Sequence, residues 1–368
     1  MSDIGIGIIG GGYMGKAHAV AYSAVGALYD TKLRPRLEMV AASSLASAEK
    51  YRAAHGFARA ANDWQTLVSD DRVEAVVIAS PPETHLPIVE AAAALGKPIF
   101  CEKPLGASPE HARAMTRTVE EAGIVNMTGF NYIRTPASQF ARKLIADGAI
   151  GDITFLRVEL TEDFHADADG DWTWRSEGEA NGCLGDLAPH PINAALALGG
   201  PIETLTAEIE QVHKTRGGKP QTNDDQVSII CRYASGARGH IFASRIATGR
   251  KMGYAYDIYG TKGAIRFDGE DQNALWFYEM SGPEETRGFR KILTGPAHPD
   301  YLAFCQGPGH GTGYQDQIII EAKDFLEAIA AGSSRFPTFR DGLEVAEVVA
   351  AARASHSSGA WTPVQKDG

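Results

Sequence analysis

Short apolar runs alternate with helix-periodic segments through the first third of the chain. Four of these runs are bounded by turn-forming or charged residues and predict buried strands at 4–9, 37–42, 75–79 and 98–101. The segments between them are rich in alanine, and one of them, "PIVEAAAALG", closes on Gly96, as helices often do. Strands that alternate with helices of this length predict right-handed crossovers and a parallel sheet.

The pattern changes after residue 130, where longer β-rich runs are joined by glycine turns. Such runs include "ITFLRVELTEDF", "QVSIICRYASGARGHIFASRIA", "YAYDIYGTKGAIRFDG" and "ALWFYEM", and the "ASGA" in the second run predicts a hairpin. Helices are predicted over 138–147, from Pro189 through "INAALALGG", over "GYQDQIIIEAKDFLEAIAAG", and in the alanine-rich C-terminal region. The second part of the chain is therefore expected to hold a mostly antiparallel sheet with helices.

Length and charge narrow the class of protein. A chain of 368 residues suits two domains better than one. Its formal net charge of -11 argues against nucleic acid or an anionic membrane as a partner, because both require a clustered positive surface. A small neutral substrate fits this charge better.

Cysteine usage and hydropathy favour the cytoplasm. The four cysteines, Cys101, Cys183, Cys231 and Cys305, lie far apart in the sequence and predict neither a disulfide framework nor a thiolate zinc site. The N-terminus lacks a basic leader region, and no run approaches the roughly 18 apolar residues of a membrane span. We expect a cytoplasmic protein.

A glycine motif follows the first predicted strand. In "IGIIGGGYMGKAH", Gly10, Gly12 and Gly15 have G-x-G-x-x-G spacing and precede a helix pattern. Such glycines allow a tight turn, close approach of a pyrophosphate and close packing of helix on strand, while the helix N-terminus faces the phosphates. The motif predicts a dinucleotide site that includes Tyr13 and Met14.

The end of the second predicted strand leaves the choice of dinucleotide open. An acidic residue there favours NAD and a following arginine favours NADP. Here Ser43 and Ser44 occupy the place, and a short hydroxyl side chain tolerates either cofactor.

The next strand ends in "SPPETH", at the edge where a doubly wound sheet faces its cofactor. Ser80, Pro81 and Pro82 would form a rigid wall there, and His85 begins a helix. The alternative is a stiff loop with a histidine whose hydrogen bonds are satisfied within the protein.

The strand after that runs into "CEKPLG" at the same edge. This places Glu102 and Lys103 at the wall of a cleft, where partial desolvation beside an oxidised nicotinamide favours a lowered lysine pKa and proton transfer. The simpler alternative is a solvated loop with an ion pair, held by Pro104.

A second candidate constellation is "NGCLGDLAPHPINAALALGG". Asp186 and His190 are four residues apart and can share a helix face, where a carboxylate can orient an imidazole as general base. Alternatively, Asp186 is an N-cap with Pro189 marking the first turn, and His190 is a packed ring.

Two metal-like patterns are discounted. "HADADGDWTWRSE" resembles a calcium loop, but His165 and Ser176 stand where carboxylates are required. His298, Cys305 and His310 match no common ligand spacing, so no metal site is expected.

Together, "GIIGGGYMGKAH", "CEKPLG" and "GDLAPHPIN", in this order and spacing, resemble the glucose-fructose oxidoreductase / inositol dehydrogenase (Gfo/Idh/MocA) family over nearly the whole chain. The resemblance implies an α/β protein with an N-terminal Rossmann NAD(P)-binding domain over 1–130. It implies a C-terminal α/β domain over 131–368, with a large open antiparallel sheet for substrate binding and for homodimer or homotetramer formation. NAD is favoured over NADP only through this resemblance.

The resemblance also implies roles for individual residues. Lys103 and His190 would flank the reacting hydroxyl, and Asp186 would support both. Asn131 joins the cofactor contacts named above. Substrate-positioning residues are proposed at Tyr132, Arg134, Asp163, Trp174, Arg175, Asn193 and His298, of which Trp174 is alternatively a core residue. Asn193 stands where the family often has a carboxylate, which leaves the substrate less certain.

The expected activity is oxidation of a secondary hydroxyl of a sugar, anhydrosugar, glycoside or polyol by NAD(P). One alternative is a glycosidase that uses NAD for transient oxidation, elimination and re-reduction. Another is a nucleotide-binding sensor without turnover, which has no need of a Lys103, Asp186 and His190 set.

Overall fold

The computed structural model describes residues 2–366, which form two compact units. The first consists of the residues up to Arg134 together with Gly313–Leu343. The second consists of Thr135–Thr312 together with the residues from Glu344 onward. A segment from near the C-terminus therefore completes the first unit.

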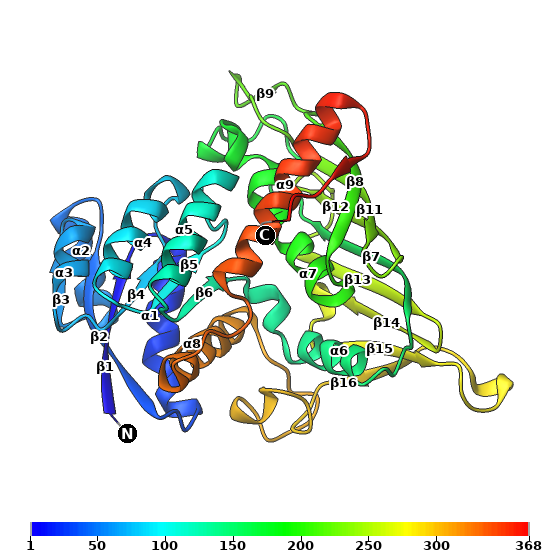
Figure 1. Ribbon diagram of the computed structural model, residues 1–368, viewed down its shortest axis with the longest axis horizontal. Coiled ribbons are helices and arrows are strands. Elements are labelled where there is room, and N and C mark those ends of the chain that lie inside the picture. The colour runs from blue at the N-terminus through cyan, green and yellow to red at the C-terminus, as the bar shows by residue number, and fades with distance from the viewer. Residues whose placement is uncertain (1, 367–368) are drawn as a thin grey trace. The chain divides into compact units, whose positions relative to one another are not determined.

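The first unit is built on a parallel sheet of six strands in the order β3-β2-β1-β4-β5-β6 (Figure 1). The strands are β1 (Ser2–Ile9), β2 (Leu33–Ala41), β3 (Arg59–Ala61), β4 (Ala75–Ile78), β5 (Ile99–Glu102) and β6 (Asn126–Gly129). The order reverses between β1 and β4, where a doubly wound sheet opens a crevice at its carboxyl edge. The predicted parallel Rossmann sheet is confirmed.

Helices flank this sheet. They are α1 (Tyr13–Leu28), α2 (Leu45–His55), α3 (Trp64–Ser69), α4 (His85–Ala94), α5 (Pro109–Glu121) and α8 (Tyr314–Ala331), with short 3-10 turns η1 (Pro82–Thr84) and η2 (Asn131–Arg134). In Figure 1, α8 (orange) lies beside α1, and the Gln315 Nε2 group donates to the Ala17 carbonyl across 2.9 Å. Helix α8 thus supports the helix that follows the glycine motif.

The second unit is built on a nine-stranded sheet in the order β16-β15-β14-β13-β7-β12-β11-β8-β17. Its strands are β7 (Ile153–Thr161), β8 (Ile202–Glu210), β11 (Gln226–Tyr233), β12 (Arg238–Ser244), β13 (Gly253–Gly260), β14 (Gly263–Asp268), β15 (Ala274–Glu279), β16 (Arg290–Leu293) and β17 (Thr362–Pro363). Strands β7 and β12 are parallel and the other neighbours are antiparallel. The predicted hairpin at "ASGA" joins β11 to β12.

Helices and short turns complete the second unit. They are α6 (Pro136–Ala146), α7 (Pro189–Gly199), the main part of α9 (Phe339–Ser358), the hairpin of β9 (Thr215–Arg216) and β10 (Lys219–Pro220), and the turns η3 (Trp174–Ser176), η4 (Glu179–Asn181), η5 (Cys183–Leu187), η6 (Gly269–Asp271), η7 (Glu284–Thr286) and η8 (Tyr301–Ala303). Helix α7 packs on β7 and β12, and α6 packs on β14 and β15 (Figure 1). Along β7, buried Leu156 and Val158 alternate with exposed Phe155 and Arg157, so one sheet face forms the core.

Within residues 2–366, no helix combines the length and the apolar character that crossing a membrane would require.

Candidate active site

The glycine turn after β1 is shaped by close backbone contacts. Gly10 has φ +128°, and a Cβ there would lie 2.3 Å from the Ala79 carbonyl oxygen. A Cβ at Gly15 would lie 2.0 Å from the Gly10 carbonyl oxygen. Among residues 2–366, a Cβ at Gly12 would meet no atom within 4 Å, and no side chain caps the N-terminus of α1. The open side of the turn therefore suits a pyrophosphate group.

The residues after β2 are arranged around the helix that follows. Ser43 and Ser44 are both exposed, and the Ser44 hydroxyl accepts a hydrogen bond from Ser47 N at 3.2 Å, which caps α2. The Tyr51 hydroxyl donates to the Gly12 carbonyl across 2.8 Å. Tyr51 thus braces the glycine turn, a contact over 39 residues that the sequence gives no sign of.

His85 lies behind the loop that follows β4. Its side chain is fully buried, with Nε2 2.9 Å from the Ser80 carbonyl oxygen and Nδ1 3.3 Å from Cys101 Sγ. Burial lowers the pKa of His85. The partners support the alternative of a satisfied histidine that holds the strand ends. The cofactor contacts of Ser80, Pro81, Pro82 and His85 stay predictions.

Glu102 and Lys103 lie at the carboxyl end of β5. Glu102 is 7% exposed, and its Oε1 lies 2.7 Å from Nε2 of His18 on α1. A Cβ at Gly129 would lie 2.9 Å from the same carboxylate, so a larger residue there would displace the Glu102 side chain. Lys103 is partly exposed. The motif thus places a buried, paired glutamate directly before a lysine near the surface.

An aromatic cluster lies beside the glycine turn. The Tyr314 ring centroid is 6.1 Å from that of exposed Tyr13 and 6.1 Å from that of Tyr132, and the Tyr314 hydroxyl lies 3.6 Å from Met14 Sδ. Burial raises the pKa of Tyr314. Tyr314 was missed in the sequence because it begins a helix about 300 residues from the motif it touches.

Two residues predicted to bind ligands are engaged inside the first unit. The Asn131 amide donates to Gln317 Oε1 at 2.9 Å, and buried Arg134 forms an ion pair with buried Asp324. Both partners lie on α8. These contacts bind Asn131 and Arg134 to α8, and their roles in ligand binding stay predictions.

Asp186 and His190 lie on two consecutive turns of different geometry. Asp186 belongs to η5, a single π-helical turn closed by a bond from Ala188 N to the Cys183 carbonyl at 2.9 Å. His190, 6% exposed, is the second residue of α7. The residue that caps α7 is Ala188, so the N-cap alternative for Asp186 is wrong. Such π-turns occur often at functional sites.

Asp186 is held by Arg175. Arg175 Nε donates to Asp186 Oδ2 at 3.0 Å, and the guanidinium lies 4.1 Å from the Trp174 ring centroid and 5.9 Å from that of Phe164. Trp174 is 55% exposed, which excludes the core alternative for this residue. An exposed indole, a guanidinium and a carboxylate therefore lie together in the second unit.

The remaining predicted substrate residues have separate surroundings. Asp163 accepts hydrogen bonds from Lys251 Nζ at 2.7 Å and Gly249 N at 3.1 Å, which lower its pKa. The His298 ring packs edge-on to Phe140, with centroids 4.7 Å apart. Asn193 is 2% exposed. Their roles toward a substrate stay predictions.

Comparisons with known proteins show the family to which the chain belongs. Residues 4–130 match the model of the oxidoreductase family with an NAD-binding Rossmann fold, and residues 138–266 match the GFO/IDH/MocA C-terminal domain. The chain is 36% identical to levoglucosan dehydrogenase of Pseudarthrobacter phenanthrenivorans over 99% of both chains, and 30% identical to inositol 2-dehydrogenase of Rhizobium meliloti over 92% of both.

Solved structures extend the likeness. Levoglucosan dehydrogenase in complex with NADH and levoglucosan has a TM-score of 0.96 and 37% identity, covering 99% of this chain and 100% of that one. An NAD-binding oxidoreductase from Klebsiella pneumoniae has a TM-score of 0.95 and 37% identity, over 99% of this chain and 100% of that chain. The chain therefore belongs to the Gfo/Idh/MocA family of NAD-binding oxidoreductases.

Proposed function

We propose that this protein is an NAD-dependent dehydrogenase that oxidises a secondary hydroxyl of a neutral sugar, anhydrosugar or polyol to a ketone. The observation that carries the proposal is the likeness, over 99% of both chains, to a levoglucosan dehydrogenase whose structure contains NADH and levoglucosan. Glycosides are included in the substrate class.

NAD fits the glycine turn, because the space at Gly12 lies beside an uncapped helix N-terminus. Gly10 and Gly15 would hold the turn, and the strand ends near Ser43, Ser80 and Lys103 would line the rest of the site. The bound cofactor supplies the hydride acceptor. Two serines after β2 leave use of NADP open.

The proton chemistry is assigned to Lys103, Asp186 and His190. A ring nitrogen of His190 accepts the proton of the substrate hydroxyl, and the Lys103 ammonium stabilises the alkoxide that forms. The Asp186 carboxylate, fixed by Arg175, supports their charges. Loss of the hydroxyl proton makes loss of hydride from the same carbon favourable.

The neighbours of Asp186 suit a neutral carbohydrate. The exposed Trp174 ring offers an apolar face, and Arg175 offers hydrogen-bond donors beside it. The charge of Arg175 is already balanced by Asp186, so a carboxylated sugar gains little there.

We propose association into homodimers or homotetramers through the outer face of the nine-stranded sheet. Phe155, Ile230 and Tyr259 are exposed on β7, β11 and β13, at 37%, 50% and 37%. A domain boundary near residue 130 stays a prediction. A cytoplasmic location also stays a prediction, which the four free cysteine thiols favour.

One experiment tests the proposed function. Levoglucosan, myo-inositol, D-apiose, D-glucuronate and a set of aryl glycosides are offered with NAD and NADP in parallel, and both reduced nicotinamide and released aglycone are followed. We expect reduced cofactor with neutral sugars. Aglycone release without net reduced cofactor would establish the glycosidase instead, and binding of NAD with neither product would establish the sensor.

A further inference from the structure

A long irregular segment, 162–182, connects β7 to the turn that carries Asp186. Apart from η3 and η4 it has no regular structure. Segments this long without regular structure are uncommon in compact domains and are often functional. Its main chain is fixed by side chains from the residue after β12 and from the residues before β11.

Arg245, the residue after β12, is buried and forms hydrogen bonds with the main chain of this segment. It is 1% exposed, and its Nη1 donates to the carbonyl oxygens of Arg175 at 2.7 Å and Asn181 at 3.2 Å. Its backbone carbonyl accepts from His165 N at 3.0 Å. Since all three contacts involve main-chain atoms of the segment, they hold its path without restricting its side chains.

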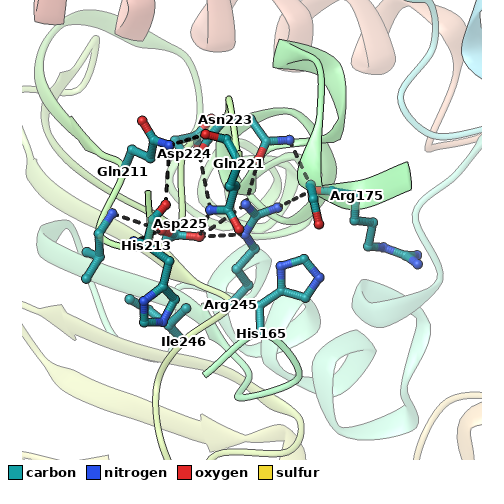
Figure 2. Close-up of polar contacts among 12 residues, drawn as sticks. His165, Arg175, Gln211, His213, Gln221, Asn223, Asp224, Asp225, Arg245 and Ile246 are labelled. Atoms are coloured by element: carbon teal, nitrogen blue, oxygen red, sulfur yellow. Dashed lines mark hydrogen bonds and ion pairs between the residues drawn. The ribbon is translucent and has the colours of Figure 1, made fainter. Parts of the chain in front are cut away.

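Asp225 balances the charge of Arg245. It is fully buried, and its Oδ1 accepts from Arg245 Nε at 3.1 Å and from Gln221 Nε2 at 2.6 Å. Its Oδ2 accepts from Val212 N and His213 N, both at 2.8 Å. Figure 2 shows the Arg245 guanidinium bonded to Asp225, Asn223 and the Arg175 carbonyl. The pair has the satisfied hydrogen bonds that burial of charge requires.

The two residues before Asp225 hold the loop and the catalytic turn. Asn223 Nδ2 donates to the carbonyl oxygens of Arg175 and Gly178, each at 3.0 Å, and its Oδ1 accepts from Arg245 Nη2 at 2.7 Å. Asp224 Oδ2 accepts from Leu184 N at 2.6 Å, and the Asp224 carbonyl accepts from Cys183 N at 3.0 Å. Three consecutive residues, "NDD", therefore anchor loop, turn and arginine at once.

Arg175 connects this anchor to Asp186. Its carbonyl is held by Arg245 and Asn223, while its side chain points away from them in Figure 2 and its Nε bonds Asp186 Oδ2. Asp186 is thus fixed from two directions, through its own turn by Asp224 and through its carboxylate by Arg175.

We propose that Arg245 and the segment 223–225 are positioning residues that set the place of Arg175 and Asp186 for the reaction. This inference rests on the role of Asp186 in the proposed function. None of the four touches substrate or cofactor in this account. They act by fixing the main chain of the loop, while the rings of Phe164 and Trp174 stay exposed beside Arg175.

The test compares purified Arg245→Lys and Asp225→Asn with wild type. Two readouts are taken: steady-state kinetics with levoglucosan and with myo-inositol, and amide hydrogen exchange of the NAD-free protein. We expect kcat/KM for the sugar to fall about 30- to 100-fold with the KM for NAD within about 2-fold. Exchange should quicken in 162–188 and stay unchanged in β1 and α1.

A double-mutant cycle shows whether Arg245 acts through Arg175. In an Arg175→Ala background, Arg245→Lys should change kcat/KM by less than about 3-fold, because the link to Asp186 is already cut. Full additivity of the two effects would overturn this route. Asn223→Ala provides a second variant in case Arg245→Lys does not fold. It removes the bonds of Asn223 to the loop and keeps the Arg245–Asp225 ion pair.

Controls separate positioning from general stability. Ile241→Val shortens a core side chain on β12, the strand that leads to Arg245, and Arg250→Lys alters an arginine paired with Asp268. Both should keep kcat/KM within about 2-fold of wild type. If Arg245→Lys matches Ile241→Val in kinetics and in exchange of 162–188, the positioning role is refuted.

Failure of the proposed function gives a different result. Normal turnover by Asp186→Asn would overturn the assignment of Asp186 itself and the inference with it. An inactive Asp186→Asn beside a fully active Arg245→Lys would overturn the positioning role alone.

Discussion

His18 Nε2 and Glu102 Oε1 lie 2.7 Å apart, although 84 residues separate them in the sequence. Both side chains are buried, and the His18 ring packs edge-on to Phe100 with centroids 4.8 Å apart. This contact ties the helix after the glycine turn to the strand that ends at Glu102, directly before Lys103. The glycine turn proposed to bind the cofactor and the proposed catalytic lysine therefore share one buried support.

Removing the charge of Glu102 should loosen this support. Glu102→Gln keeps the shape but weakens the bond to His18, because hydrogen bonds to a charged group contribute about 1.5–3 kcal/mol. We expect a lower Tm by differential scanning calorimetry and a kcat reduced about 10-fold. His356→Asn, which alters a partly exposed histidine near Glu208, is the matched control and should change neither. Unchanged kcat in Glu102→Gln would speak against a link to Lys103.

The glycine turn offers a matched pair of alanine substitutions. Gly12→Ala meets open space in the protein and should keep the Tm, while its methyl group should obstruct the pyrophosphate and weaken NAD binding at least about 10-fold by calorimetric titration. Gly15→Ala places its Cβ 2.0 Å from the Gly10 carbonyl oxygen and should lower the Tm by itself. Equal loss of Tm in both variants would contradict the assigned geometry.

The buried His165 should make the free energy of unfolding sensitive to acid. Its ring is 3% exposed, and burial together with the nearby Arg245 and Arg216 lowers its pKa to about 4. In the unfolded chain the histidine takes up a proton below about pH 6.5, so stability is fully present above that pH and is lost as the pH falls toward 4.

The size of this effect is about 2 kcal/mol at pH 5. Chemical denaturation of wild type and His165→Gln between pH 8 and pH 5 checks it. The variant should lose less free energy of unfolding on acidification. Parallel curves for the two proteins would refute the assignment.

Glu321 should give the free energy of unfolding the opposite dependence on pH. It is fully buried on α8, neither carboxyl oxygen has a hydrogen-bond partner within residues 2–366, and burial, with a smaller effect of Glu102, raises its pKa well above the usual range. The folded protein keeps this proton, whereas the unfolded chain releases it above about pH 4.5. Its contribution to stability is therefore present below that pH and is lost as the pH rises.

Glu321→Gln mimics the protonated acid at every pH. We expect it to raise the free energy of unfolding at pH 8 by at least about 1 kcal/mol, with the difference shrinking toward pH 5. Asp316→Asn, on the first turn of the same helix, controls for loss of a carboxylate near the surface. The prediction would be contradicted if the gain in free energy of unfolding over wild type were smaller at pH 8 than at pH 5.

Local patterns in the sequence were enough for much of the fold. The run 4–9 within β1 and the strand Ala75–Ile78 contain no polar side chain, and the turn after the first needs glycine for reasons visible in the motif. Strand β3 was missed because it has three residues, and β6 because "NMTG" contains no apolar run. These two strands pair through the backbone, with little help from side-chain pattern.

The site was predictable only in part. The spacing of Asp186 and His190 predicted residues on neighbouring turns, which η5 and α7 are, but the π-turn arises from non-local packing. A Cβ at Gly182 would lie 2.1 Å from Asp224 Oδ1, and one at Gly185 would lie 2.4 Å from the Ala180 carbonyl oxygen. Arg245 gave no signal at all, because a charged residue after a strand is usually solvated.

The most direct test of the central claim is the initial rate of NADH formation by Lys103→Met and Asp186→Asn. Each is measured beside wild type with the neutral sugar that reduces NAD fastest, and NAD binding is checked by titration. We predict that both variants bind NAD and lose at least about 100-fold in rate, the loss expected when a positioned proton-transfer group is removed. Near-normal rates in either purified variant would contradict the assignment of proton chemistry to these residues.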